Sequence, residues 1–235
     1  MKSNAELLED VALALAPLPY GRVFVGGATT HLFISDVAAP GVSPTNDVDV
    51  VVNVQSAVEF SVHLGEQLRR LGFQEDTSED APLCRWKVQG TTVDIMTPNE
   101  QILGFSNRWY GIALQRSETH TVGDLEIQVI DAVTFLGTKI EAFNNRGKDD
   151  FLASKDIEDI IAVLDGRPEL SSELEGREPE LLAFIAASLS AWTGRSDFGY
   201  AIEGYLQSDE ERIPPLKLRI DSIISACRKG SQSHQ

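Results

Sequence analysis

The sequence predicts an α/β fold, in which a small mixed sheet is flanked by helices and followed by a C-terminal helical part. Two observations favour this class. Short apolar runs of strand length alternate with amphipathic segments of helix length up to about residue 164. Beyond Arg167 the pattern becomes helical and acidic. We therefore expect a core over residues 1–130 and a helical region over residues 131–235.

Five short runs rich in apolar and β-branched residues are the expected strands: Arg22 to Val25, Asp47 to Asn53, Leu83 to Val88, Thr91 to Met96 and Glu126 to Ile130. The continuous valines of the second run are typical of a strand buried on both faces. Gln89-Gly90 is a turn signal, so the third and fourth runs should form a hairpin with Asp94 on its central strand.

The expected helices of the first part are set by their boundary signals. Ala5 to Ala16 is amphipathic and is followed by two prolines. A short helix is expected over Thr29 to Ile34, then a loop over Ser35 to Asn46. The capping box from Ser56 to Glu59 opens another helix, which Gly72 closes.

Helical periodicity dominates the second part of the chain. We expect helices over Asp131 to Asn144, over Lys155 to Leu164, through the apolar stripe from Leu181 to Trp192, over Asp197 to Leu206 and over Leu218 to Cys227. Pro214-Pro215 should break the chain before the last of these. Two further segments, Gln74 to Asp80 and the tail Arg228 to Gln235, are expected to be an acidic loop and a disordered end.

Three aspartates are the candidate metal ligands. Asp47 and Asp49 are two residues apart on one expected strand, so their side chains project from the same face. Two carboxylates on one face repel each other unless a cation lies between them. Asp94, on a neighbouring strand, would complete a two-metal site for in-line displacement at phosphorus. Mg²⁺ fits because it prefers carboxylate and phosphate oxygens, and Mn²⁺ is a possible substitute.

Gly26 and Gly27 follow the first expected strand and are the candidate phosphate cradle. Glycine has no Cβ, so a triphosphate can approach the backbone closely, and the N-terminus of the next helix offers N–H groups to an anion. Thr29 and Thr30 could bind the nucleotide phosphates or cap that helix. A lone Gly-Gly is usually a turn and a lone Asp-x-Asp is often a solvated strand edge, but their order along this chain favours a site.

The order Gly-Gly, Asp-x-Asp and a third Asp resembles the DNA polymerase β-type nucleotidyltransferase superfamily. Thr45-Asn46-Asp47-Val48-Asp49 resembles the acidic strand of that superfamily. Downstream, Lys139, Arg146 and the segment Lys155 to Ile160 are similar to the AbiEii-like group of abortive-infection and toxin–antitoxin proteins. Two features depart from the pattern: nineteen residues separate Gly27 from Asp47, and an insertion lies around residues 147–153.

The resemblance implies roles that spacing alone does not give. Lys139 would bind the nucleotide and neutralise charge on its phosphates. From the residues alone it would not be chosen and is interpreted as an ordinary snorkelling lysine. Asp156 and Asp159 share a helical face. They could orient Lys139 or stabilise the N-terminus of their helix. An acceptor that is RNA such as tRNA, and an antitoxin partner, are further expectations of this resemblance.

Composition narrows the protein class. Two distant cysteines, Cys84 and Cys227, have no metal or redox spacing and suit a reducing cytoplasm. The N-terminus does not have the pattern of a signal peptide, and no apolar stretch is long enough to span a membrane. The formal net charge of −16 argues against a surface that binds nucleic acid generally. We expect a cytoplasmic protein that does not engage a membrane.

These observations together predict a Mg²⁺-dependent nucleotidyltransferase that moves a nucleoside monophosphate from an NTP to an acceptor hydroxyl. The first alternative is a small-molecule acceptor, as in antibiotic nucleotidyltransferases. The second is a non-catalytic protein that binds a nucleotide or a partner and keeps the fold. A metal-dependent phosphohydrolase is disfavoured because the four histidines do not cluster in the sequence.

Overall fold

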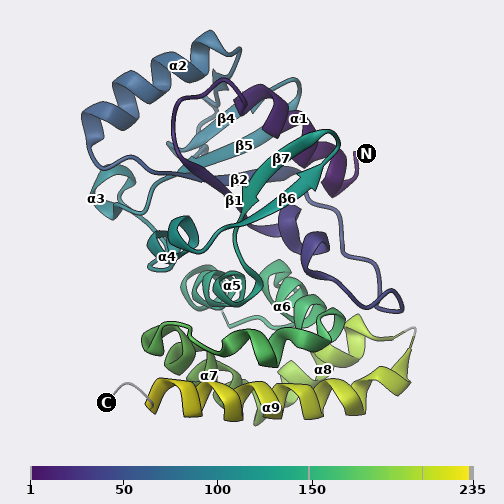
Figure 1. Cartoon of the computed structure of the whole chain (residues 1–235). Helices are drawn as coiled ribbons and strands as arrows, with labels where there is room; N and C mark the ends of the chain where they lie inside the picture. The colour runs from purple at the N-terminus through teal and green to yellow at the C-terminus, as the bar shows by residue number, and fades with distance from the viewer. Residues whose placement is uncertain (1, 148, 208, 233–235) are drawn as a thin grey trace. The chain divides into compact units, whose positions relative to one another are not determined.

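The structure, a computed structural model, describes residues 2–147, 149–207 and 209–232. The chain divides into two compact units (Figure 1). The first unit comprises residues 1–29 and 43–131, and the second comprises residues 30–42 and 132–235. The segment 30–42 therefore belongs with the C-terminal half of the chain, although it follows the first strand directly in sequence.

Within the described residues, the first unit is built on a seven-stranded mixed sheet of order β3-β4-β5-β2-β1-β7-β6. Its strands are β1 (Arg22–Val25), β2 (Asp47–Val52), β3 (Gln74–Glu75), β4 (Arg85–Val88), β5 (Thr91–Met96), β6 (Glu118–Val122) and β7 (Leu125–Val129). β2 pairs with β5 in parallel, as does β1 with β7, and the other neighbours are antiparallel. The predicted α/β class and all five predicted strands are confirmed.

Two edge elements of the sheet were not predicted. β3 was expected to be part of an acidic loop, and its two residues are polar and exposed. β6 has one buried residue, Val122, among polar neighbours. Neither segment has the apolar run or the alternation that marks a half-buried strand. Their pairing depends on β4 and β7, which supply ladder partners that local sequence does not reveal.

One face of the sheet is apolar and the other carries charge. Helix α1 (Asn4–Leu15) contacts β2, β5, β6 and β7 (Figure 1). Val48 and Val50 of β2, and Val93 of β5, are fully buried. Asp47 and Asp49 alternate with these valines and are only partly buried. The expectation of two buried faces on β2 therefore holds for its second half alone, and the first half presents carboxylates.

The helix predicted from Ser56 is present but irregular. The Ser56 hydroxyl accepts a hydrogen bond from the Glu59 backbone N–H at 3.2 Å, as a capping residue does. The first turns form a π-helix, η2 (Glu59–Leu64), which continues as α2 (Gly65–Arg70). Gly72 ends the helix with a φ of +89°, the left-handed conformation expected after a helix C-terminus. Two short helices, α3 (Glu100–Leu103) and α4 (Tyr110–Gln115), follow β5.

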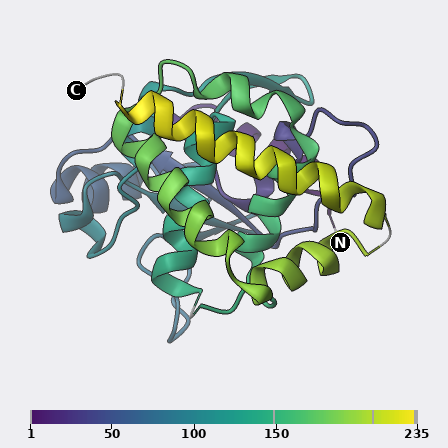
Figure 2. The same cartoon turned by 90° about the horizontal axis from the view of Figure 1, so that it is seen from below.

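The second unit is helical, as predicted. Its long helices are α5 (Ala132–Arg146), α6 (Lys155–Gly166), α7 (Pro179–Thr193), α8 (Ser196–Tyr205) and α9 (Ile213–Gln232). Short turns η3 (Pro168–Leu174) and η4 (Glu210–Arg212) connect them. α7 and α9 lie side by side (Figure 2). Aromatic rings of Phe143, Phe151, Trp192 and Phe198 pack at centroid distances of 4.7 to 5.8 Å in its core.

Two expectations for the C-terminal end were wrong. Pro214-Pro215 do not break the chain but lie in the first turn of α9, where a missing N–H costs nothing because those groups have no partner within the helix. Residues 228–232, expected to be disordered, continue α9, which buries Cys227 and Ile224. Residues 233–235 lie outside the described part of the chain.

The helix expected over Thr29 to Ile34 is a 3₁₀-helix, η1 (Gly27–Phe33). Its second half is anchored in the second unit. The ring of Phe33 lies 4.7 Å from that of Phe135, and the backbone N–H groups of Ser35 and Asp36 donate to the Gly166 carbonyl. In the described part of the chain, no helix has both the length and the apolar character needed to cross a bilayer.

Candidate active site

The charged face of the sheet is built around one transverse row of residues. Val25 of β1 pairs with Asp49 of β2, Asp49 pairs with Asp94 of β5, and Asp94 pairs with Arg85 of β4. Directly paired residues point to the same face of a sheet, and neighbouring strands are about 4.8 Å apart. The register therefore sets the two carboxylates next to each other, with the guanidinium on the far side of Asp94.

Asp47 lies two residues before Asp49 on β2, about 7 Å along the strand, and shares its face. The Thr45 hydroxyl donates to Asp47 Oδ1 at 2.6 Å. This bond fixes the carboxylate at the point where the long loop 35–46 enters β2. The predicted grouping of Asp47, Asp49 and Asp94 on one face is thus present in the first unit.

Gly26 contacts Asp49 directly. It ends β1 with a φ of +73°, and a Cβ at this position would overlap the Asp49 carboxylate, whose Cγ would be only 2.7 Å away. Gly27 begins η1. Thr29 is fully buried, and its hydroxyl donates to the Gly26 carbonyl at 2.8 Å. Gly26 therefore meets the acidic strand at the Asp49 carboxylate.

Asp94 is engaged by Arg85 through both carboxylate oxygens. Arg85 Nε donates to Oδ1 at 2.8 Å and Nη2 donates to Oδ2 at 2.7 Å. This bond to Asp94 raises the pKa of Arg85 further above its ordinary value, so the guanidinium remains charged. Asp94 as a whole residue is 8% exposed. The ion pair offsets the cost of burying its carboxylate in the sheet.

The donor set suits a hard divalent cation, because Asp47 and Asp49 offer carboxylate oxygens beside a glycine turn that carries no side chain. Across residues 2–147, 149–207 and 209–232, however, no three acidic, histidine or cysteine side chains form a preassembled metal cluster. Binding through all three aspartates would require the Asp94 carboxylate to be shared with, or released by, Arg85.

The carboxylates of this face affect the pKa of the buried Cys84 thiol. Burial, and then the charges of Asp94 and Asp49, raise the pKa of its thiol to about 12. The thiol is therefore neutral at physiological pH and is a poor nucleophile. Cys84 is buried near the acidic row, and its neutral thiol is not a candidate metal ligand.

Lys139 lies in a buried ion network within the second unit. Its Nζ is 2.6 Å from Asp159 Oδ2 and donates to Asp156 Oδ1 at 3.1 Å. The Lys139 side chain is 8% exposed. Thr30, fully buried, donates its hydroxyl to Asp159 Oδ1 at 3.0 Å. Asp156 and Asp159 both contact the Lys139 ammonium, and Thr30 donates to the same network. That these carboxylates orient Lys139 for a function stays a prediction.

Arg146 closes the network at the surface, where it donates from Nε and Nη2 to Asp156, both at 3.1 Å. Burial tends to raise the pKa of Asp156, but Lys139 and Arg146 outweigh it, so the pKa lies below its ordinary value. Two cations and two carboxylates balance one another. The interpretation of Lys139 as a snorkelling lysine is wrong, since its ammonium is held inside the unit.

Two contributors to these arrangements were missed from the sequence: Arg85 and the bond from Thr30 to Asp159. Thr45 belongs to the predicted acidic motif, but its bond to Asp47 was not predicted. Arg85 stands in an alternating strand pattern, Arg85-Trp86-Lys87-Val88, which predicts only that it shares a face with Lys87. The hairpin register could have paired it with Asp94. Nothing local could have joined Thr30 to Asp159, which is 129 residues away.

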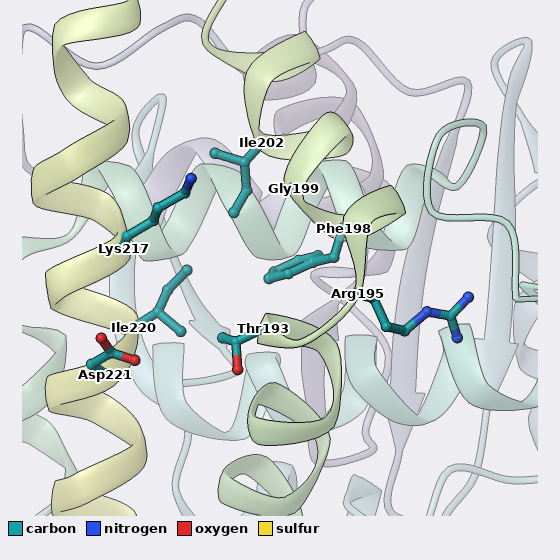
Figure 3. Close-up of a pocket in the computed structure, with 8 residues that line it drawn as sticks. All are labelled: Thr193, Arg195, Phe198, Gly199, Ile202, Lys217, Ile220 and Asp221. Atoms are coloured by element: carbon teal, nitrogen blue, oxygen red, sulfur yellow. The ribbon is translucent and has the colours of Figure 1, made fainter.

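The second unit contains a pocket of about 330 Å³ whose lining differs from the acidic face of the sheet (Figure 3). Phe198, Ile202 and Ile220 supply apolar side chains to it, with Lys217 and Asp221 from α9 at one side. Arg195 points away from the Phe198 ring in Figure 3 and is paired with Asp197 and Asp149. The pocket contains no pair of carboxylates comparable to that on the sheet.

Comparison with known proteins adds little to this geometry. No protein-family model matches the chain, and no curated protein matches it. Among solved structures, the chain is similar to an antigenic nucleotidyltransferase-like protein from Paracoccidioides brasiliensis. The TM-score is 0.49 at 19% sequence identity, over 94% of this chain and 93% of that chain. A likeness at this level assigns neither family nor activity.

Proposed function

We propose that the protein is a divalent-metal-dependent nucleotidyltransferase that transfers a nucleoside monophosphate from an NTP to an acceptor hydroxyl. The observation that carries the proposal is the contact between Gly26 and the Asp49 carboxylate, beside Asp47 and Asp94 on one sheet face. A glycine turn that must stay free of side chains, set against paired carboxylates, suits a metal-bound triphosphate.

The proposed reaction is an in-line displacement at the α-phosphorus. The acceptor oxygen forms a bond to this phosphorus, the bond to the bridging oxygen of the β-phosphate breaks, and pyrophosphate leaves. Asp94 would bind the catalytic metal and take the proton of the acceptor hydroxyl. Asp47 and Asp49 would hold both metal ions, Mg²⁺ or Mn²⁺, which would supply charge stabilisation for the attacking and leaving oxygens.

The nucleotide is held, in this proposal, by the backbone of Gly26 and Gly27. Thr29 supports the turn through its bond to the Gly26 carbonyl, and Thr30 acts through Asp159. Binding of the triphosphate by Lys139 stays a prediction. Its ammonium is already compensated by two carboxylates, so a phosphate contact would have to replace one of those pairs.

The acceptor class follows from charge and from the AbiEii resemblance. The resemblance favours a toxin-like enzyme that acts on RNA such as tRNA, with an antitoxin as partner. The net charge of −16 favours a small-molecule acceptor instead, because a polyanionic acceptor is repelled unless a local basic strip receives it. We place RNA first and the antibiotic-type acceptor second; incorporation of label from α-labelled NTPs into tRNA or into aminoglycosides distinguishes them.

The test of the nucleotide site is calorimetric titration of the four NTPs, with and without Mg²⁺. The proteins compared are wild type, Asp47→Ala and Asp49→Ala. We expect binding that requires both the metal and the two aspartates. Circular dichroism should show that the variants keep the fold, since both side chains are partly solvated.

Metal-independent binding, or binding that survives both substitutions, contradicts the proposed site. If wild type binds no NTP in any condition, the same titration is repeated with the acceptor candidates present. Failure there as well would favour the alternative class, a non-catalytic protein that keeps the acidic strand for binding a partner.

A further inference from the structure

We propose that Arg85 is an internal counter-cation for Asp94 that competes with the divalent metal, and so sets the metal affinity of the carboxylate face. The inference rests on the proposed function, because it assumes that Asp47 and Asp49 bind a metal. It assigns a role to a residue that neither the acidic motif nor the glycine turn includes.

The first support is the geometry of the ion pair. Arg85 and Asp94 are paired across the β4–β5 hairpin, and two parallel hydrogen bonds of 2.8 and 2.7 Å occupy both carboxylate oxygens. This planar fork is the strongest common arrangement between Arg and a carboxylate. A metal ion that approaches Asp94 must therefore share an oxygen with a cation or displace it.

The second support is the distribution of charge on this face. Asp94 is flanked by Asp49 on one side and Arg85 on the other. Lys87, on the same strand and face as Arg85, is paired with Asp76 at 2.9 Å. Arg85 therefore neutralises the third carboxylate while Lys87 serves a different partner, so the two cations can be tested separately.

The third support is burial. The Asp94 side chain is 12% exposed and that of Arg85 is 31% exposed, so water screens the pair less than it screens a surface ion pair. Without metal, Arg85 compensates a carboxylate that is costly to leave alone. With metal, the guanidinium is a like charge beside the ion and weakens its binding.

The experiment measures Mn²⁺ affinity by calorimetry and by the electron paramagnetic resonance signal of free Mn²⁺, without nucleotide. Arg85→Gln should bind Mn²⁺ about tenfold more tightly than wild type, because a positive charge next to the site is gone. Lys87→Gln is the matched control: it removes one charge from the same face without touching Asp94, and should change affinity by less than about twofold.

Arg85→Gln leaves Asp94 without its partner, so a lower melting temperature is expected, together with a larger rise on adding Mn²⁺. If that variant does not fold, Arg85→Lys keeps the charge but loses the fork and should tighten binding to a smaller degree. In an Asp94→Asn background, either substitution should have little further effect, because the competition is for that carboxylate.

Unchanged or weaker Mn²⁺ binding in Arg85→Gln, with binding in wild type that depends on Asp47 and Asp49, overturns the role of Arg85 and leaves the proposed function standing. An equal gain in Lys87→Gln also overturns it, since the effect would then be general charge. Absence of binding through Asp47 and Asp49 in every variant removes both proposals together.

Discussion

The Asp49 carboxylate lies against the Cα of Gly26, at a distance that leaves no room for a Cβ. Gly26 also has a φ of +73°, a backbone conformation that residues with a Cβ rarely adopt. Two separate requirements for glycine thus meet at one residue. The first comes from the turn after β1, and the second comes from the carboxylate on β2. The contact connects the glycine turn to the acidic strand.

Gly26→Ala should lower the free energy of unfolding by roughly 2 to 5 kcal/mol, from left-handed strain together with overlap on Asp49. It should also abolish metal-dependent NTP binding, because the carboxylate has to move. Urea unfolding followed by circular dichroism, and calorimetry with Mg²⁺ and NTP, measure the two effects.

Gly104→Ala is the matched control for that substitution. Gly104 has a φ of +79° at the end of α3, but a Cβ there would meet open space. It should cost only the strain, roughly 1 to 2 kcal/mol, and leave NTP binding intact. Equal effects of the two substitutions would mean that contact with Asp49 contributes nothing.

Thr45→Val should weaken Mn²⁺ binding about tenfold with little loss of stability, because a residue that orients a metal ligand has an effect of that order. The Thr45 hydroxyl holds Asp47 Oδ1 at 2.6 Å. Thr121→Val on the exposed strand β6 serves as the control. Calorimetry that finds the same affinity in both variants would show that Asp47 does not need this bond.

Lys139→Met should lower the free energy of unfolding by about 3 to 5 kcal/mol at pH 7, since it leaves Asp156 and Asp159 buried without their shared cation. Lys155→Met is the control: that lysine is 71% exposed and pairs with Glu158, so its loss should cost less than about 1 kcal/mol. Urea titrations of both variants provide the comparison.

The penalty of Lys139→Met should shrink in acid. The pKa of Asp156 lies below its ordinary value of 3.8 in the folded protein. Its contribution to stability is therefore present above about pH 4 and is lost as the pH falls through the folded-state pKa. Wild type and Lys139→Met should converge as the carboxylates protonate. A difference in unfolding free energy that stays constant from pH 7 down to about pH 2 would contradict an electrostatic origin.

Neither cysteine should react with thiol reagents in the native protein at pH 8. Burial raises the pKa of Cys227 to about 12, and burial with the nearby aspartates does the same for Cys84. Each should react once its own unit unfolds. Single Cys84→Ala and Cys227→Ala variants then report the unfolding of the two units separately, by absorbance of the released thiol product in increasing urea. Fast reaction without denaturant would mean that a thiol is exposed.

The sequence located correctly those segments whose apolar periodicity matches the face that they bury in the folded protein. The valines of β2, the turn at Gln89-Gly90 and the stripe of α7 each bury a face that their own periodicity defines. Segments without such a face, β3 and β6, were not predicted. Their strand form depends on neighbours supplied by other parts of the chain.

The sequence by itself determined the α/β class, the strand that carries Asp47 and Asp49, and the helices that carry Lys139 and Asp156, because residue spacing fixes which side chains share a face. Only the tertiary structure decided which charges are paired. Arg85 meets Asp94 through hairpin register, and Thr30 meets Asp159 across 129 residues. Ion pairs form between side chains that the fold brings within about 4 Å, and separation along the chain does not specify that distance.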